Sequence, residues 1–241
     1  MEIIDGMWTM RGLAHDDPKR IRSADELAEY INEVGFLPLF SNEIPGFSSE
    51  ELTASQYWWC DIPEHDPWIW REQIARTEKI AYGKFFGGRA GYISLEWLPY
   101  FVNWRRDGYD FDSLFEDGKA QHRSKKIMDL FLTRDRLFSY EIKKLAGFGK
   151  NGEKNFPGVI TKLQEQIYLV SCDFQRRRNA KGEPYGMTTT LYATPESIWG
   201  YDTVTAAYSE EPEQSKQRIV EHIRKLYGNV DDKTMEKVLG K

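Results

Sequence analysis

Three carboxylates in the first half of the chain could carry out acid–base chemistry. Glu64 and Asp66 flank His65, and Glu43 follows an apolar segment earlier in the sequence. Titratable groups that share a pocket with aromatic side chains often have shifted pKa values and act as catalytic acids or bases. We therefore predict Glu43, Glu64 and Asp66 as candidate catalytic residues. The simpler alternatives are that Asp66 caps a helix, that His65 lies on the surface, and that Glu43 accepts backbone hydrogen bonds in a loop.

Tryptophans are concentrated around these acids in the sequence. They are Trp58, Trp59, Trp68 and Trp70. Such side chains could form an aromatic pocket and stack on nucleobases, which contributes about 1–3 kcal/mol for each base. Packing in the hydrophobic core is the alternative. Trp68 and Trp70 are two positions apart in a predicted helix and cannot share one face, so at least one of them should be partly exposed.

Basic residues are concentrated in the second half of the chain. Between Lys119 and Lys181 there are fifteen Lys and Arg and six Asp and Glu, although the whole chain has a net charge of −5. Lys and Arg that neutralise phosphates release counterions and contribute affinity for nucleic acid without reading its sequence. The candidate DNA contacts are Lys143, Lys150, Lys154, Lys162, Arg176, Arg177, Arg178 and Lys181. The alternatives are a solvated charged face and a hairpin tip whose charge prevents edge pairing.

Two helices joined by a polar turn are expected around the first of these basic residues. Ser139 is a suitable N-cap for a helix over residues 140–146, which the glycine-rich residues 147–149 would end. Asn155 is a suitable cap for a second helix, and Pro157 falls in its first turn, where a missing N–H costs little. The pattern therefore predicts a helix–turn–helix.

A hairpin is expected to follow the second helix. Residues 168–175 alternate with a period of two, and residues 185–192, rich in Thr and aromatic side chains, return as a strand. The basic segment over residues 176–182 would form the tip. A helix–turn–helix followed by such a hairpin is the layout of a winged helix, which usually binds nucleic acid.

The remaining patterns predict a mainly helical α+β fold. Helices are expected over residues 24–34, 68–76, 99–106, 120–133, 213–227 and 232–239, and strands over residues 80–86 and 90–94. We expect two domains, an aromatic and acidic region over residues 1–110 and a basic region over residues 111–241.

Composition excludes several classes of protein. Cys60 and Cys172 are far apart in the sequence, and the histidines lack the spacing of metal ligands, so neither a disulfide framework nor a metal site is expected. No apolar segment of about 20 residues is present, which argues against a membrane span. The acidic start of the chain does not resemble a signal peptide, and we expect a cytoplasmic protein. No cofactor is expected.

The order of several segments resembles that of a known family. Residues 36–41, the hairpin over residues 81–86, the segment over residues 95–101 and the winged-helix stretch over residues 139–199 follow one another as in the AlkZ/YcaQ family. The similarity is greater to the shorter bacterial AlkZ-related proteins. The resemblance implies a tandem winged-helix fold that binds double-stranded DNA on a concave surface. The full-length enzymes of the family are DNA glycosylases that remove alkylated bases and unhook some crosslinked ones.

The chain departs from that family at the positions that carry its chemistry. The family uses a Gln–apolar–Gln or Gln–apolar–Asp triplet that positions a water molecule and stabilises positive charge on the sugar, but the matching residues here are Pro38, Leu39 and Phe40. A His-Glu pair of the family falls on Arg89 and Ala90. The resemblance thus implies a DNA-binding protein that acts in damage recognition or as an accessory, without inherited catalysis.

Two other functions fit the same residues. One is an active DNA glycosylase that uses the relocated carboxylates named above. The other is a small-molecule-binding protein or enzyme on the same scaffold, which the acidic, tryptophan-rich first half favours.

Overall fold

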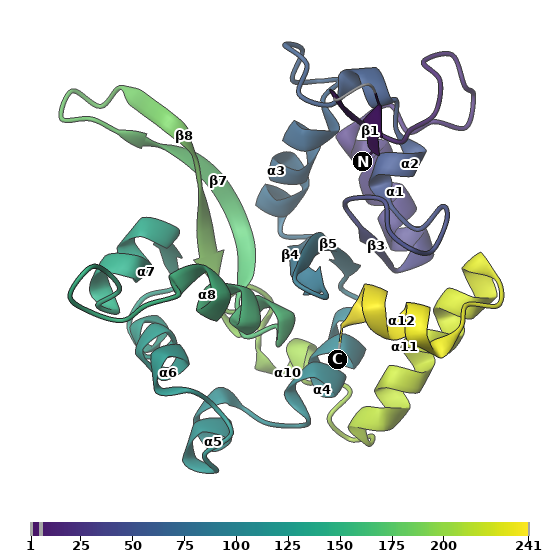
Figure 1. Ribbon diagram of the computed structural model, residues 1–241. Coiled ribbons are helices and arrows are strands. Elements are labelled where there is room, and N and C mark those ends of the chain that lie inside the picture. The colour runs from purple at the N-terminus through teal and green to yellow at the C-terminus, as the bar shows by residue number, and fades with distance from the viewer. Residues whose placement is uncertain (1, 5–6, 241) are drawn as a thin grey trace. The chain divides into compact units, whose positions relative to one another are not determined.

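The computed structural model describes residues 2–4 and 7–240 and contains two compact units (Figure 1). Unit 1 comprises Met1–Leu98 and Lys216–Lys241, and unit 2 comprises Pro99–Ser215. Helix accounts for 45% and strand for 19% of the chain, so the predicted mainly helical α+β class is confirmed. The division into functional domains over residues 1–110 and 111–241 stays a prediction. None of the helices in the described residues is long and apolar enough to cross a membrane.

Two helices in the first part of unit 1 begin at N-cap residues that are recognisable in the sequence. The Ser23 hydroxyl accepts the N–H of Glu26 at 3.1 Å and starts α1 (Ala24–Val34), which ends at Gly35 with a φ of 87°. Ser48 caps α2 (Ser49–Leu52) in the same way. The other elements of this part are β1 (Glu2–Ile4), β2 (Met7–Thr9), η1 (Ser55–Tyr57) and α3 (Pro67–Thr77).

A three-stranded antiparallel sheet forms the centre of unit 1, in the order β3-β5-β4. The strands are β3 (Phe36–Pro38), β4 (Ile80–Phe86) and β5 (Arg89–Ser94). Gly91 faces Pro38 on one side and Gly83 on the other. A Cβ at position 91 would lie 2.4 Å from the Phe86 ring and 2.8 Å from the Leu37 carbonyl oxygen, so only glycine fits.

The C-terminal helices of unit 1 pack against this sheet. They are α11 (Pro212–Tyr227), whose first residues fall in unit 2, and α12 (Asp232–Leu239). The Gly87 N–H donates to the Leu239 carbonyl at 3.0 Å, and the Arg89 guanidinium donates to the Lys237 carbonyl at 2.9 Å. The turn between β4 and β5 therefore holds the end of the chain.

Unit 2 contains the expected helix pair and hairpin. Its helices are α4 (Leu98–Arg106, which begins in unit 1), α5 (Phe111–Glu116), α6 (His122–Met128), η2 (Asp129–Leu132), α7 (Ser139–Leu145), α8 (Phe156–Glu165), α9 (Pro195–Trp199) and α10 (Tyr201–Val204). Its strands are β6 (Arg136–Phe138), β7 (Val170–Arg178) and β8 (Pro184–Ala193), in the order β6-β8-β7. Buried Ile142, Leu163 and Tyr168 join the helices to the sheet in one core.

Two local predictions in unit 2 are wrong in detail. Ser139 is the first helical residue rather than the cap, because the extended Phe138 already ends β6 and its N–H donates to the Glu141 carboxylate at 2.9 Å. The helix expected over residues 120–133 is α6 followed by a tighter 3-10 turn from Asp129. The side chain of Lys125 bonds the Asp129 carboxylate at this change.

Candidate nucleic-acid interface

The turn between α7 and α8 is held in a defined shape. Asn155, with a φ of 62°, accepts the Gly158 N–H at 3.3 Å and begins α8, as predicted. Lys126 on α6 forms an ion pair with Glu153 at 2.7 Å, which lowers the pKa of Glu153. The Arg123 guanidinium donates to the carbonyl of Lys154 at 3.0 Å. Two side chains of α6 therefore hold the turn that precedes α8.

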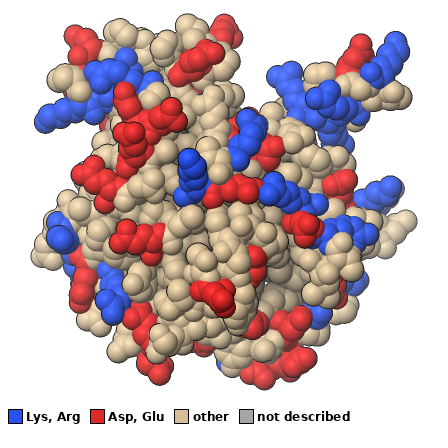
Figure 2. Space-filling model, turned by 180° about the vertical axis from the view of Figure 1, so that it is seen from behind, with Lys and Arg blue, Asp and Glu red and all other residues tan. Residues whose placement is uncertain are grey.

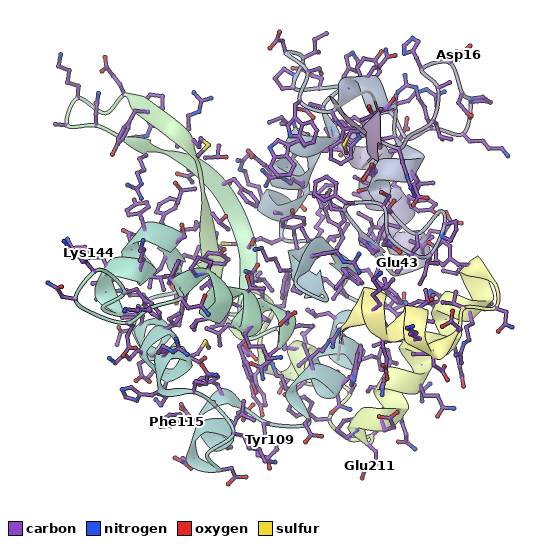
Figure 3. The ribbon with its side chains drawn as sticks, viewed as in Figure 1. Asp16, Glu43, Tyr109, Phe115, Lys144 and Glu211 are labelled. Atoms are coloured by element: carbon purple, nitrogen blue, oxygen red, sulfur yellow. The ribbon has the colours of Figure 1, made fainter. Side chains whose placement is uncertain are left out.

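Exposed lysines follow this turn and both helices. Lys143 lies on α7, Lys150 and Lys154 lie in the turn, and Lys162 lies on α8. The ammonium groups of the first three make no hydrogen bond or ion pair within the described residues, whereas Lys162 is 3.8 Å from Glu165. Figure 3 shows the neighbouring Lys144 side chain directed away from α7. The charges of Lys143, Lys150 and Lys154 are therefore free to bind an external anion.

The β7–β8 hairpin extends beyond the helices of its own unit (Figure 1) and carries a group of basic side chains, visible in Figure 2. Arg177 lies over the Tyr140 ring at 4.2 Å, and Arg178 donates to the Gly182 carbonyl at 2.8 Å. Arg176 and Lys181 have no side-chain partner in the described part of the chain. Of the four basic residues predicted to contact DNA from this hairpin, Arg177 and Arg178 therefore also make contacts within the protein.

A groove of about 240 Å³ lies between α6 and α8. Its cationic lining residues are Lys119, Arg123 and Lys162, and its uncharged polar ones are Gln121, Ser124, Asn155 and Gln166. In the part of the chain that the structure describes, no acidic residue lines this groove. Sequence reasoning missed Lys119, Gln121 and Arg123, although the local charge excess included two of them. Only the packing of this segment against α8 places them beside Lys162.

The aromatic side chains of unit 1 form a cluster that omits one predicted member. Trp58, Trp59 and Trp68 lie together with Phe40, with ring centroids between 5.5 and 6.3 Å apart. Trp70 is instead fully buried and donates its indole N–H to the Glu64 carbonyl at 2.9 Å, as the core alternative anticipated.

Access to this cluster is limited. The Arg71 guanidinium covers the Trp68 ring at 3.8 Å, and Trp58 is buried with its indole N–H bonded to Thr53 at 3.0 Å. Trp59 is 51% exposed and has a φ of 60°, which is unusual for a bulky residue. Of the predicted stacking residues, Trp59 is thus the one that offers the most ring surface to a ligand.

The three predicted carboxylates have different environments, and no hydrogen bond joins any two of them in the described residues. Asp66 is buried and accepts the N–H groups of Trp59 at 3.0 Å and Trp68 at 2.8 Å. Burial raises its pKa. Glu64 is exposed, and its carbonyl rather than its carboxylate bonds Trp70. Asp66 has the helix-cap role that the simpler alternative assigned to it.

Glu43 is an ion-paired surface residue. Its carboxylate is 2.8 Å from the Lys237 ammonium and 3.3 Å from the Arg89 guanidinium, and Figure 3 shows it in the loop after β3. The hydrogen bond from Lys237, with the charge of Arg89, lowers the pKa of Glu43. A carboxyl that must donate a proton needs a raised pKa, so this environment does not favour Glu43 as a general acid.

The residues predicted to match the family's catalytic groups serve in packing. Pro38 ends β3 opposite Gly91, Leu39 is buried, and Phe40 belongs to the aromatic cluster. Arg89 anchors α12 through the Lys237 carbonyl.

A protein-family model described as AlkZ related matches residues 21–240, which includes parts of both units. The chain belongs to the AlkZ-related family. Comparison with characterised proteins and with solved structures finds no significant match. In the described part of this AlkZ-related chain, no group of three or more His, Cys, Asp and Glu side chains is placed to hold a metal ion.

Proposed function

We propose that this AlkZ-related protein binds double-stranded DNA through unit 2, with α7, α8 and the β7–β8 hairpin acting as a winged helix. The single observation that carries the proposal is the set of exposed basic side chains without partners on these elements. Isolated surface lysines are common, but here they follow one helix–turn–helix and its hairpin. The remaining acidic surface explains the net charge of −5 without opposing this role.

Each element has a distinct part in the proposed complex. Helix α8 is the recognition helix, and Lys150 and Lys154 contact phosphates beside its N-terminus. The groove between α6 and α8 accepts a backbone phosphate, because it has three cations and space for such a group. Arg176 and Lys181 on the hairpin contact the backbone at a second point.

The protein would act in DNA damage recognition or as a DNA-binding accessory. The sheet β3-β5-β4 with its neighbouring helices supplies the second module of the proposed tandem winged-helix assembly. Pro38 and Phe40 at the family's catalytic positions support binding without inherited base excision. Family membership supports the link to DNA.

Fluorescence anisotropy with a labelled duplex at several salt concentrations tests the proposal. The affinity should fall linearly on a log–log plot, with a slope of about −0.9 for each neutralised phosphate. Reversing two charges with Lys150→Glu and Lys154→Glu should lower the affinity about tenfold or more. Lys225→Glu with Lys233→Glu, two exposed lysines on α11 and α12, changes the net charge equally and is the matched control.

The control pair should alter the affinity by less than about twofold, because its lysines lie outside the proposed winged helix. An equal loss in both double variants would show that net charge, and not this surface, governs binding. Absence of salt-dependent binding by the wild-type protein would contradict the proposal itself.

A second candidate is a DNA glycosylase centred on Asp66. The observation that favours it is the raised pKa of this buried carboxyl beside the exposed Trp59. Counting abasic sites after incubation with alkylated duplex DNA tests it, together with Asp66→Asn, Glu43→Gln and Glu64→Gln. Excision that is absent, or that Asp66→Asn leaves unchanged, removes this candidate.

A further inference from the structure

Met187 on β8 is an apolar side chain in a basic hairpin. It is 90% exposed, more than any other large hydrophobic residue recorded as exposed in the described part of the chain. Tyr185, two positions earlier, is 50% exposed. Single exposed apolar residues are ordinary on protein surfaces. Met187 differs because it lies at an irregularity in the strand pairing of the hairpin.

The strand pairing changes at this point. Thr188 pairs with Arg176, and Tyr185 pairs with the next residue of β7, Arg177. Gly186 and Met187 therefore have no partner across the hairpin, which defines a bulge. Gly186 has a φ of 71°, a conformation that glycine adopts without strain. Bulges redirect side chains and often lie beside functional sites.

The bulge is supported on the side of the helices. Arg177 lies 4.2 Å above the Tyr140 ring, and Tyr140 stacks on Phe138 with centroids 5.4 Å apart and an interplanar angle of 10°. These contacts tie β7 to the start of α7 at the residue where the register changes. Met187 is consequently displayed from a fixed position and not from a free loop.

The tip beyond the bulge is also ordered by its own hydrogen bonds. The Asn179 carboxamide oxygen accepts the N–H of Lys181 at 2.9 Å and of Glu183 at 3.0 Å. The side chains of Arg176 and Lys181 remain without partners in the described residues. Positive charge therefore lies on both sides of the exposed methionine along the hairpin.

We infer that Met187 is a wedge that enters the minor groove and inserts at a weakened base step, so that the protein prefers duplex DNA that is locally unstacked. Proteins that bind the minor groove insert apolar side chains, methionine among them, between base steps, while basic side chains contact the flanking backbone. Insertion costs less where a base is missing or mispaired. This inference rests on the proposed DNA binding and adds a source of selectivity to it.

The test uses two duplexes of equal length, one perfect and one with a single abasic-site analogue next to 2-aminopurine. The wild-type protein should bind the damaged duplex about fivefold or more tightly, and 2-aminopurine fluorescence should rise on binding as its base unstacks. Met187→Ala should bring the two affinities within about twofold and abolish the rise, with little change for the perfect duplex. Met187→Leu, which restores apolar bulk, should recover both.

Leu132→Ala is the matched control, since Leu132 is a 70% exposed apolar residue on η2 of the same unit. It should leave the preference unchanged. Because Met187 is exposed, its alanine variant should unfold at the wild-type temperature. An unchanged preference in Met187→Ala overturns the inference while DNA binding stands. Failure of the wild-type protein to bind either duplex overturns the proposed function as well.

Discussion

Replacing Arg176 with glutamine should weaken DNA binding and its salt dependence, whereas the same change at Arg177 should mainly loosen the hairpin. The two residues are adjacent on β7 and carry the same charge. Arg176 has no side-chain partner in the described residues, while Arg177 lies over the Tyr140 ring at 4.2 Å. Their different contacts allow net charge to be separated from phosphate contact.

The magnitude follows from counterion release. One lost phosphate contact makes the salt slope about 0.9 less steep. Between about 50 and 150 mM salt, that difference changes the affinity by about 2.7-fold. Arg177→Gln should change the slope by less than half as much. It should instead lower the free energy of unfolding by about 0.5–1 kcal/mol, which is typical of an exposed cation–π contact.

Anisotropy titrations of one labelled duplex at five or more salt concentrations would measure the slopes, and urea denaturation would measure stability. Arg176→Lys keeps the charge and should retain most of the slope. If Arg176→Gln and Arg177→Gln flatten the slope equally, the cation–π contact does not withhold Arg177 from DNA. If neither changes it, the hairpin does not contact phosphates.

Other variants test the structural roles assigned above. Asp66→Ala should lower the free energy of unfolding by about 1–2 kcal/mol, because two backbone N–H groups lose their acceptor, whereas Asp66→Asn should cost less; chemical denaturation measures both. Glu43→Gln should cost about 0.5–1 kcal/mol at neutral pH. Because the pKa of Glu43 is lowered in the folded state, its contribution to stability is fully present above the ordinary glutamate pKa of about 4.3. The contribution is lost as the pH falls through the lower pKa of the folded state, which thermal melts from pH 7 downward would show. Gly152→Ala should lower DNA affinity and stability together, because its Cβ would lie 2.1 Å from the Gly147 carbonyl oxygen and displace the α7–α8 turn.

Local signals in the sequence predicted most of the elements. Ser23, Asp66 and Asn155 begin their helices because each side-chain oxygen has an N–H group within three residues to accept, and this needs no tertiary contact. The strands of the long hairpin follow from a period of two and from the glycine at its tip. The prediction of Ser139 as an N-cap is wrong by one residue, because β6 extends to Phe138. The strand depends on pairing with β8, which is distant in the sequence.

Long-range contacts of the candidate sites could not be predicted. Nothing local indicates that Arg71 covers the Trp68 ring or that Lys237 reaches Glu43 from the other end of the chain. The bulge at Met187 depends on a register change between two strands, which Gly186 permits but does not require. Hence the sequence composition predicts the concentration of basic residues. The contacts made by Arg177 and Arg178 can be known only from the folded structure.

A net negative charge is compatible with the proposed DNA binding because charge acts locally at physiological ionic strength. The Debye length there is about 8 Å, so exposed acids farther than this from the duplex oppose binding only weakly. The net charge of −5 is therefore the wrong quantity for predicting affinity, and the excess of fifteen Lys and Arg over six Asp and Glu between Lys119 and Lys181 is the relevant one. At low salt the screening weakens, and the acidic remainder should slow association. The association rate of the wild-type protein should consequently rise less on dilution of salt than that of an isolated basic module, which stopped-flow anisotropy would detect.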